Sequence, residues 1–240
     1  MTASGSLRGF GRRLARRLRR RTVRWGSLRS AMPVSRVFGL DRGTPIDRVY
    51  IERFLGEFAG DIRGSCLEVA ETTYMDRFGG ERVTARSVLH AEAGLEAATL
   101  VGDLATGEGL PAEAFDCVIL TQTLHCVYDI AAAVRHARSM VRPGGVALCT
   151  LPGISQVSEY DMRRWGDCWR VTGLAARRLF EDAFGAAGVE VREYGSVLTA
   201  TAFLQGLAAE ELTADELSAR DEAYPLLVGV RAARGEGERS

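Results

Sequence analysis

The 240-residue sequence contains no lysine, so its 31 basic residues are all arginine. It also contains no apolar run long enough to cross a bilayer, and no charged-then-apolar export signal with a small-residue cleavage site. These absences argue against an integral membrane or exported protein and predict a cytosolic one. Because 46% of the residues are hydrophobic, a chain of this length can bury one substantial core, and we expect one main domain.

Motifs for metal and redox chemistry are missing as well. None of the five cysteines forms a Cys-x-x-Cys pair, and no His or carboxylate cluster has the spacing of metal ligands. Cys66, Cys117 and Cys149 lie within predicted strands, which favours buried structural thiols. Cys126 lies instead in a turn that we expect to face a ligand. We therefore predict no metal site.

Acidic residues are absent from residues 1–40, which contain eleven arginines. The other 200 residues keep 20 of the basic and all 31 of the acidic groups, a net charge of about −11. On a helical wheel the large apolar side chains of the basic segment share one side, and arginines occupy the others. We therefore predict a basic amphipathic helix within residues 1–35. Its apolar side consists of Leu7, Phe10, Leu14, Leu18 and Trp25.

Such a helix has several interpretations. It either lies on an anionic membrane surface through residues 7–29, contacts nucleic acid or an acidic protein, serves as a removable transit sequence, or packs on the acidic body of its own chain. Each arginine near an anionic surface contributes about 1 kcal/mol of binding free energy. The cluster can therefore hold the protein reversibly at a membrane, which is the interpretation that we favour, and we do not expect a nucleic-acid partner.

The remaining sequence alternates between strand and helix patterns. Residues 115–120 and 146–151 are apolar runs without period-two alternation, and Ile130, Val134, Ala137 and Val141 repeat at helical spacing between them. This pattern predicts parallel strands of an open α/β sheet, where ligands bind beyond the carboxyl ends of the strands, here at residues 121–129. Further predicted strands cover residues 66–70, 83–89, 98–102, 189–194 and 226–231.

Capping residues mark two helix starts. Thr44, Pro45 and Asp47 fit an N-cap, a first helical position and a capping box. Thr172 is placed to cap a second helix that extends through Phe184 and stops at the following glycine.

Four motifs lie in or beside the predicted strands: Leu67-Glu68-Val69-Ala70 in the first, Asp103 after the third, residues 115–120 as the fourth and Arg142-Pro143-Gly144-Gly145 before the fifth. Together they resemble the class I S-adenosylmethionine-dependent methyltransferases, of the type 11 kind. Residues 38–48 also resemble a subgroup often associated with glycan or natural-product assembly. The resemblance implies an α/β, Rossmann-like sandwich with a mostly parallel sheet and helices on both faces. It divides the chain into the basic helix within residues 1–35, a methyltransferase-like domain at 36–234 and a polar tail at 235–240.

The glycine-rich motif of this family is degenerate here. Its three glycine positions hold Ala70, Thr72 and Tyr74. If any of them required a left-handed backbone, a non-glycine residue would cost about 1–2 kcal/mol. Where the family has an acid for the ribose hydroxyls, this chain has Ser87, with Glu92 as a substitute.

The resemblance implies S-adenosylmethionine as the cofactor. Glu68 either contacts this cofactor or holds the neighbouring loop by accepting backbone N–H bonds, and Asp103 either meets the adenine or caps the following turn. The cofactor-binding residues that we predict are Glu68, Ala70, Glu71, Ser87, Asp103, Leu104 and Thr121.

Methyl transfer depends on holding the acceptor in line with the sulfonium methyl group, and a base is optional. His125 is our candidate base because it follows the fourth strand and its ordinary pKa is about 6.5, although a packed turn histidine is the alternative. His90 and His136 are weaker candidates. For the acceptor we predict contacts from Asp47, Arg48, Tyr50, Tyr160, Asp161, Arg164, Trp165 and Trp169, in a cluster that also holds Asp167 and Arg170. The alternative is that Trp165 and Trp169 only pack a helix onto the body.

We therefore predict methyl transfer from S-adenosylmethionine to a small-molecule, sugar or glycan-intermediate acceptor. The second hypothesis is a non-catalytic methyltransferase-like binding module that has lost its cofactor. A nicotinamide-dependent oxidoreductase is disfavoured because no Gly-x-Gly-x-x-Gly follows the first strand.

Overall fold

The computed structural model describes residues 26–94 and 96–237. The whole chain divides into two units, residues 1–33 and 34–240. In the first unit the described part contains a short 3-10 helix, Gly26–Arg29. The arginine-rich stretch before Gly26, for which we predicted an amphipathic helix, lies outside the described residues.

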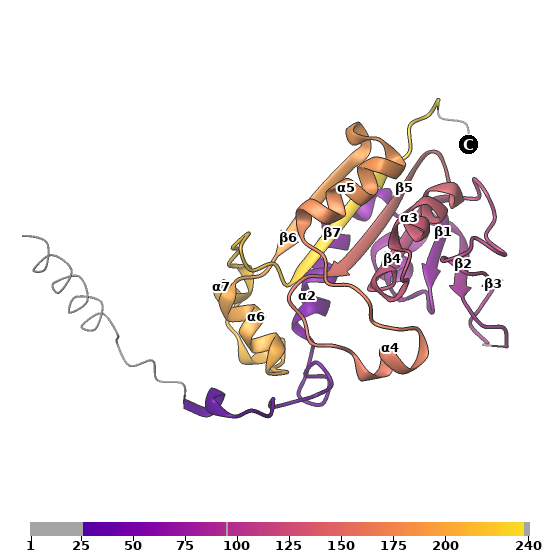
Figure 1. Cartoon of the computed structure of the whole chain (residues 1–240). Helices are drawn as coiled ribbons and strands as arrows, with labels where there is room; N and C mark the ends of the chain where they lie inside the picture. The colour runs from indigo at the N-terminus through magenta and orange to yellow at the C-terminus, as the bar shows by residue number, and fades with distance from the viewer. Residues whose placement is uncertain (1–25, 95, 238–240) are drawn as a thin grey trace, which may run out of the picture. The chain divides into compact units, whose positions relative to one another are not determined.

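A mostly parallel sheet forms the centre of the second unit (Figure 1). Seven strands pair within the described residues in the order β3-β2-β1-β4-β5-β7-β6. All pairs from β3 to β5 are parallel, and β7 is antiparallel to both of its neighbours. The strands are β1 Gly64–Val69, β2 Val83–His90, β3 Leu100–Val101, β4 Phe115–Thr121, β5 Val141–Pro152, β6 Val189–Tyr194 and β7 Leu227–Ala233. This confirms the predicted α/β, Rossmann-like fold.

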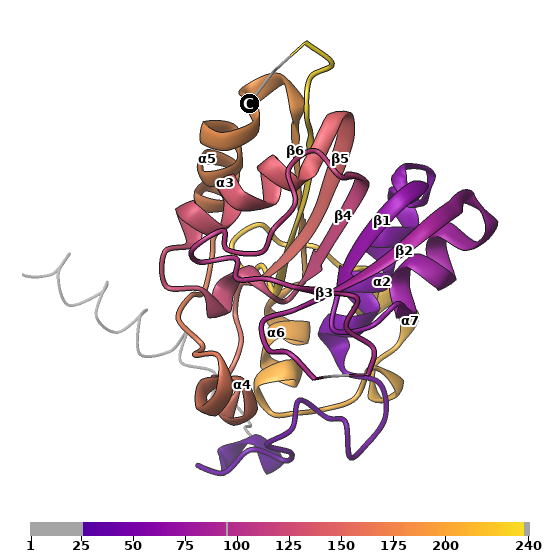
Figure 2. The same ribbon diagram turned by 90° about the vertical axis from the view of Figure 1, so that its right-hand side faces the viewer.

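Helices cover both faces of the sheet (Figure 2). Val118 of β4 belongs to a core cluster with helices α3 and α5, whereas its neighbour Cys117 belongs to a second cluster with α2 and α6. Burial on both faces explains why these strands are continuously apolar. The α-helices are α2 Ile46–Glu57, α3 Ile130–Met140, α4 Glu159–Arg164, α5 Gly173–Phe184, α6 Val197–Leu204 and α7 Ala214–Ser218. None of the helices among the described residues is long and apolar enough to cross a membrane.

The two predicted helix starts have different outcomes. Thr172 caps α5 by accepting a hydrogen bond from the Ala175 N–H at 3.3 Å, and Gly185 ends the helix at a φ of +82°, as predicted. The capping box at α2 is wrong. Pro45 occupies the N-cap without a side-chain bond, and the Thr44 hydroxyl donates to Glu210 at 2.7 Å, because residues 208–211 pack beside this helix start.

Strand boundaries differ from the predictions in ways that affect the site. β2 extends to His90, and β3 is reduced to two residues because this edge strand pairs only with β2. Val141 begins β5 and does not continue the helix before it, as its spacing predicted, and the register of β5 against β4 is irregular. The parallel strands β1 to β5 each end one residue away from where the sequence patterns put them.

Candidate functional site

Two neighbouring cavities lie at the carboxyl ends of the parallel strands. The larger has a volume of about 480 Å³, within the usual size range of small-molecule sites. Its walls come from the segments that follow β1, β2, β3 and β4, and from the α4 region. Its lining includes Val69, Ala70, Leu89, His90, Ala91, Gly102, Asp103, Leu104, Ala105, Gln122, Thr123, Cys126, Val127, Tyr128, Asp161, Arg164, Trp165 and Cys168.

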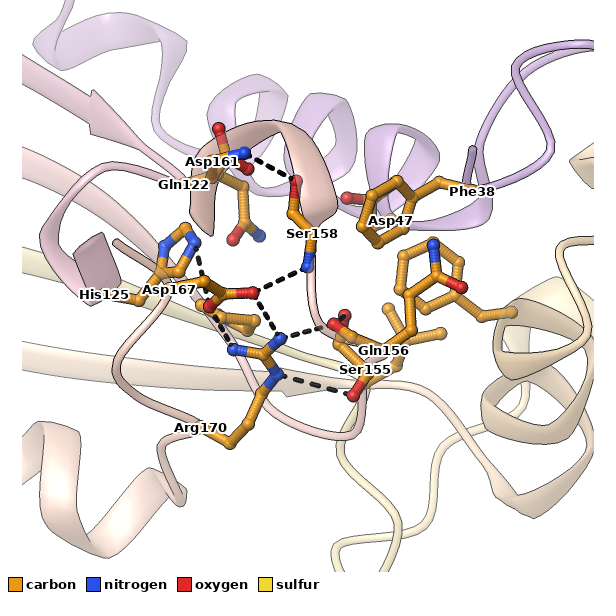
Figure 3. Close-up of a pocket in the computed structure, with 13 residues that line it drawn as sticks. Phe38, Asp47, Gln122, His125, Ser155, Gln156, Ser158, Asp161, Asp167 and Arg170 are labelled. Atoms are coloured by element: carbon orange, nitrogen blue, oxygen red, sulfur yellow. Dashed lines mark hydrogen bonds and ion pairs between the residues drawn. The ribbon is translucent and has the colours of Figure 1, made fainter. Parts of the chain in front are cut away.

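The smaller cavity has a volume of about 110 Å³ and shares Gln122 and Asp161 with the larger one (Figure 3). Gln122 directly follows β4 and has a left-handed φ of +47°, a strained conformation that is often found at functional sites. Its N–H donates to the Thr150 carbonyl oxygen at 3.1 Å, which fixes it at the end of β5. The other lining residues are Phe38, Asp47, His125, Pro152, Ser155, Gln156, Ser158, Asp167, Arg170, Phe203 and Leu226.

The loop after β1 does not fill the larger cavity. Of the three positions that lack the family glycines, only Ala70 has a positive φ, +71°, and only Ala70 lines the cavity. The Thr72 hydroxyl donates to Asp76 at 2.6 Å, and the Tyr74 ring stacks on Phe78 with a centroid distance of 6.4 Å. The strain of a non-glycine residue is therefore confined to one position.

Glu68 holds this loop in place and does not line the cavity. Its carboxylate accepts hydrogen bonds from the N–H groups of Tyr74 at 3.1 Å and Met75 at 2.8 Å. Burial raises the pKa of Glu68 to about 7, against the opposing effect of these N–H donors. The predicted cofactor contact of Glu68 is corrected to loop support, because both oxygens are turned toward the backbone. Glu71 is exposed and also lies outside the lining.

The prediction that Ser87 stands at the ribose hydroxyls is wrong, because β2 continues beyond this residue. Ser87 lies three residues before the end of this strand, opposite Leu67 of β1, and does not reach the cavity. His90 and Ala91 line it instead. The Glu92 side chain lies outside the lining, but its N–H donates to His90 Nδ1 at 3.0 Å, so a neutral His90 ring carries its proton on Nε2.

Asp103 caps the following turn, and it also has a place at the larger cavity. It lines the larger cavity, and its Oδ1 accepts the Ala105 N–H at 2.7 Å in the following turn. Leu104 lines the same wall. Thr121 is the last residue of β4 and lies outside the lining, whereas Gln122 and Thr123 belong to it.

The α4 region contributes mainly to the larger cavity, although we predicted acceptor contacts there. Arg164 and Trp165 line this cavity, and the Trp165 ring meets His90 edge-on at 5.5 Å. Tyr160 lies outside the lining and supports Arg164, whose guanidinium is 3.6 Å from the centre of the Tyr160 ring. Trp169 also supports the wall from outside, because its indole N–H donates to the Tyr128 carbonyl oxygen at 3.1 Å.

A buried ion pair supports one side of the smaller cavity (Figure 3). Arg170 donates through two nitrogens to Asp167 at 2.5 and 2.8 Å, and the Ser158 N–H donates to the same carboxylate at 2.7 Å. Burial opposes ionisation of Asp167, yet Arg170 and the Ser158 N–H together hold its pKa below the ordinary value. His125 Nε2 lies 3.8 Å from Asp167 Oδ1.

His125 is almost completely buried beside this pair. Burial lowers its pKa below the ordinary histidine value, although Asp167 opposes the shift. The ring is therefore neutral at pH 7. Its Nδ1 has no hydrogen-bond partner within the described part of the chain. His125 is thus a neutral imidazole at the wall of the smaller cavity.

Of the acceptor contacts that we predicted at Asp47, Arg48 and Tyr50, only Asp47 lines a cavity. Asp47 lines the smaller cavity, and burial raises its pKa to about 6. Arg48 is exposed outside the lining. Tyr50 is a core residue that stacks on Tyr194 at 5.8 Å, because it falls on the same buried helical stripe as Ile46 and Phe54.

A family model described as a methyltransferase domain matches residues 39–194, well over half of the chain. The chain belongs to this methyltransferase family. The match agrees with the motif resemblance to the class I S-adenosylmethionine-dependent methyltransferases, which implies S-adenosylmethionine as the cofactor.

Several solved methyltransferase structures are similar to this chain. An S-adenosylmethionine-dependent methyltransferase from Archaeoglobus fulgidus is 10% identical, with coverage of 78% of this chain and 94% of that one and a TM-score of 0.49. One from Mesorhizobium loti is 18% identical, with coverages of 82% and 100% and a TM-score of 0.48. The N-methyltransferase NodS from Bradyrhizobium japonicum is 13% identical, with coverages of 80% and 98% and a TM-score of 0.46. No curated protein matches the sequence.

The larger cavity of this methyltransferase fits its cofactor. It has room for a nucleoside, because Thr72 and Tyr74 lie outside it. Val69, Leu89 and Leu104 offer apolar surface for the adenine ring. Polar groups on the same walls, including the Asp103 carboxylate and the His90 ring, are available to the ribose hydroxyls and the charged end of S-adenosylmethionine.

Some lining residues lie just beyond the ends of the predicted strands. His90 directly follows the predicted strand 83–89, and Gln122 is the second residue after the predicted strand 115–120, within the segment where we expected a ligand. Phe38 and Phe203 come from segments that are far apart in sequence and meet with a ring distance of 5.6 Å. No local signal in the sequence indicates that contact.

Proposed function

We propose that this methyltransferase transfers the methyl group to a small polar group of a sugar or glycan-intermediate acceptor, bound in the smaller cavity. The observation that carries the proposal is that Gln122 and Asp161 line both cavities, so the two cavities adjoin at these residues. When bound, S-adenosylmethionine would supply an electrophilic methyl group to this site. An acceptor held in the adjoining smaller cavity would have the proximity on which methyl transfer depends.

The smaller cavity supports this class of acceptor by its chemistry. Asp47 and Asp161 offer hydrogen-bond acceptors to hydroxyl or amine groups, and Phe38 and Phe203 offer apolar ring surface. A volume of about 110 Å³ admits one small moiety, so the rest of a larger acceptor stays outside.

We assign the general base to His125. In this role a neutral ring nitrogen takes the proton of the acceptor O–H or N–H as the acceptor lone pair forms the bond to the methyl carbon. The Asp167 carboxylate, 3.8 Å from Nε2, stabilises the imidazolium that results. The low pKa of His125 keeps the base form available at neutral pH.

Two measurements test the two cavities. Calorimetry with S-adenosylmethionine and S-adenosylhomocysteine measures cofactor binding in the larger cavity. Asp103→Ala is expected to weaken this binding about tenfold or more, because a hydrogen bond to a charged group is lost. Asp182→Ala, an exposed carboxylate on α5, is the matched control and is expected to bind as the unaltered protein does.

Transfer of labelled methyl groups to a panel of sugar-containing acceptors measures the acceptor side. His125→Gln is expected to lower kcat by about 10²–10⁴ while leaving cofactor affinity unchanged. An unchanged kcat would remove His125 as the base. Saturable cofactor binding without transfer to any sugar-containing acceptor would contradict the acceptor class.

We also propose that residues 7–29 hold the methyltransferase reversibly at an anionic membrane surface. The support is the sequence of this segment, in which arginines surround a stripe of leucine and aromatic residues.

A further inference from the structure

Helix α6 is apolar on both of its sides. Its inner side places Ala202 and Phe203 in the core. Its outer side exposes Val197, Leu198 and Leu204, with 53%, 44% and 41% of their surface accessible. A helix that is apolar all round is ordinarily covered on every side. The outer side of α6 therefore needs a partner.

Residues 34–40 extend the same apolar surface. Val34 and Ser35 donate their N–H groups to the Gln205 carbonyl oxygen at 2.8 and 3.0 Å, which fixes this segment at the carboxyl end of α6. Both views show the segment beside this helix (Figures 1 and 2). It turns Phe38 inward onto Phe203 and exposes its other large apolar side chains. We call the exposed set the apolar rim; it consists of Val34, Val37, Leu40, Val197, Leu198 and Leu204.

The charges around the apolar rim select the kind of partner. Residues 34–40 and 195–208 contain no acidic residue, and Arg36 is the one charged residue in both stretches. Residues 1–33, which lead directly into the rim, contain ten arginines and no acid. An apolar surface without acidic residues, in a chain whose preceding 33 residues are strongly basic, is complementary to a surface with an apolar interior beneath anionic groups.

We propose that the apolar rim docks this protein onto an anionic lipid bilayer. Phe38 and Phe203 line the smaller cavity and come from the same two segments as the rim, so docking brings that cavity close to the bilayer. The consequence for the substrate rests on the proposed function: an acceptor that carries a lipid chain presents its polar group to the cavity while its chain stays in the bilayer. The small cavity volume agrees with this arrangement.

Vesicle flotation of the full-length chain tests the docking surface. The vesicles are neutral phosphatidylcholine, alone or with about 30% phosphatidylglycerol. The test variant is Leu198→Asp and the control is Leu174→Asp on α5, which lies on the opposite face of the sheet. Both leucines are exposed second residues of helices capped by Ser196 and Thr172. An acid is favourable in the first turn of a helix, so both variants are expected to fold.

The unaltered protein is expected to float with the anionic vesicles. Leu198→Asp is expected to lower the vesicle partition coefficient about tenfold, through lost apolar contact and added repulsion, whereas Leu174→Asp stays within about twofold. Equal binding by the two variants would overturn the proposal, as would an unaltered protein that binds neither vesicle. Gel filtration identifies a second copy as the occupant, and thereby overturns the proposal, if only Leu198→Asp shifts a dimer to a monomer.

Cofactor calorimetry on the same variants separates this proposal from the proposed function. Unchanged affinity for S-adenosylmethionine together with lost vesicle binding supports docking. Normal vesicle binding together with no methyl transfer to any acceptor would contradict the proposed function and leave the docking surface in place.

Discussion

At the residue scale, Ala70 is the point where this methyltransferase departs most clearly from its family. It keeps the left-handed backbone that a glycine would adopt freely, at a φ of +71°. Of the three positions that lack the family glycine, only this one therefore carries the strain of a left-handed backbone. Thr72 and Tyr74 occupy positions where the chain has no need of glycine.

Replacing Ala70 by glycine is expected to stabilise the protein. Relief of the left-handed strain is worth about 1–2 kcal/mol, and the greater freedom of glycine in the unfolded chain offsets about 0.4–1 kcal/mol of it. Urea unfolding is therefore expected to show a gain in unfolding free energy of up to about 1.6 kcal/mol. Ala105→Gly, a position without positive φ in the same cavity wall, is the control and is expected to lose stability. A loss at both positions would contradict strain at Ala70.

Glu68 provides a pH-dependent prediction. Burial raises its pKa to about 7 in the folded state, above the ordinary glutamate value, so the folded protein binds this proton more tightly than the unfolded chain does. Its contribution to stability is present at low pH and is lost as the pH rises through about 7. Urea unfolding at several pH values between about 5 and 8 is expected to show a steeper decline for the unaltered protein than for Glu68→Gln. Parallel curves would show that Glu68 does not titrate in this range.

At the element scale, the segment between β5 and α5 owes its conformation to one ion pair. Asp167 is almost completely buried and accepts bonds from both Arg170 and the Ser158 N–H. This arrangement fixes the segment that carries Ser155, Gln156 and Ser158 into the smaller cavity. The element is thus shaped by a charge pair and has little regular secondary structure beyond the six residues of α4.

Removing one partner of this pair is expected to be more damaging than removing both. Arg170→Ala leaves the Asp167 carboxylate buried without its cation, at a cost of about 3 kcal/mol or more in unfolding free energy. The double variant Arg170→Ala, Asp167→Ala is expected to recover part of this loss. Arg163→Ala is the control, since its pair with Glu159 is exposed and worth less than about 1 kcal/mol. Equal losses in the single and double variants would contradict a penalty from the unpaired charge.

At the scale of the whole molecule, charge is divided between the first 40 residues and the rest of the chain. The basic segment carries eleven arginines, and the remainder has a net charge of about −11. Two features then favour an anionic surface: the arginines of residues 7–29, and the apolar rim that follows this basic segment in the sequence.

The contribution of the basic segment is tested by deleting residues 1–30. Each arginine near an anionic surface contributes about 1 kcal/mol, so the shortened chain is expected to bind phosphatidylglycerol vesicles far more weakly in flotation. The dependence on salt is expected to fall as well, since screening acts on the same charges. Equal flotation of the two chains at low salt would contradict a role for this segment.

The sequence by itself determined the order of strands and helices and the position of the ligand-binding edge. Apolar periodicity and capping are local properties, so the sheet, the end of α5 and the segment after β4 could be found without coordinates. For the same reason the predictions were weakest where a contact comes from elsewhere. Thr44 bonds to Glu210 instead of capping α2, and neighbouring strands set the length of β2.

Only the tertiary structure decided which side chains enter the two cavities. Whether a carboxylate lines a cavity depends on loops that close around it: Glu68 and Asp103 both accept backbone N–H bonds, but only Asp103 also lines the larger cavity. Phe38 meets Phe203, and His125 meets Asp167, across long stretches of sequence. These contacts exist because packing of the whole sheet brings distant segments together, and no pattern within one segment records that.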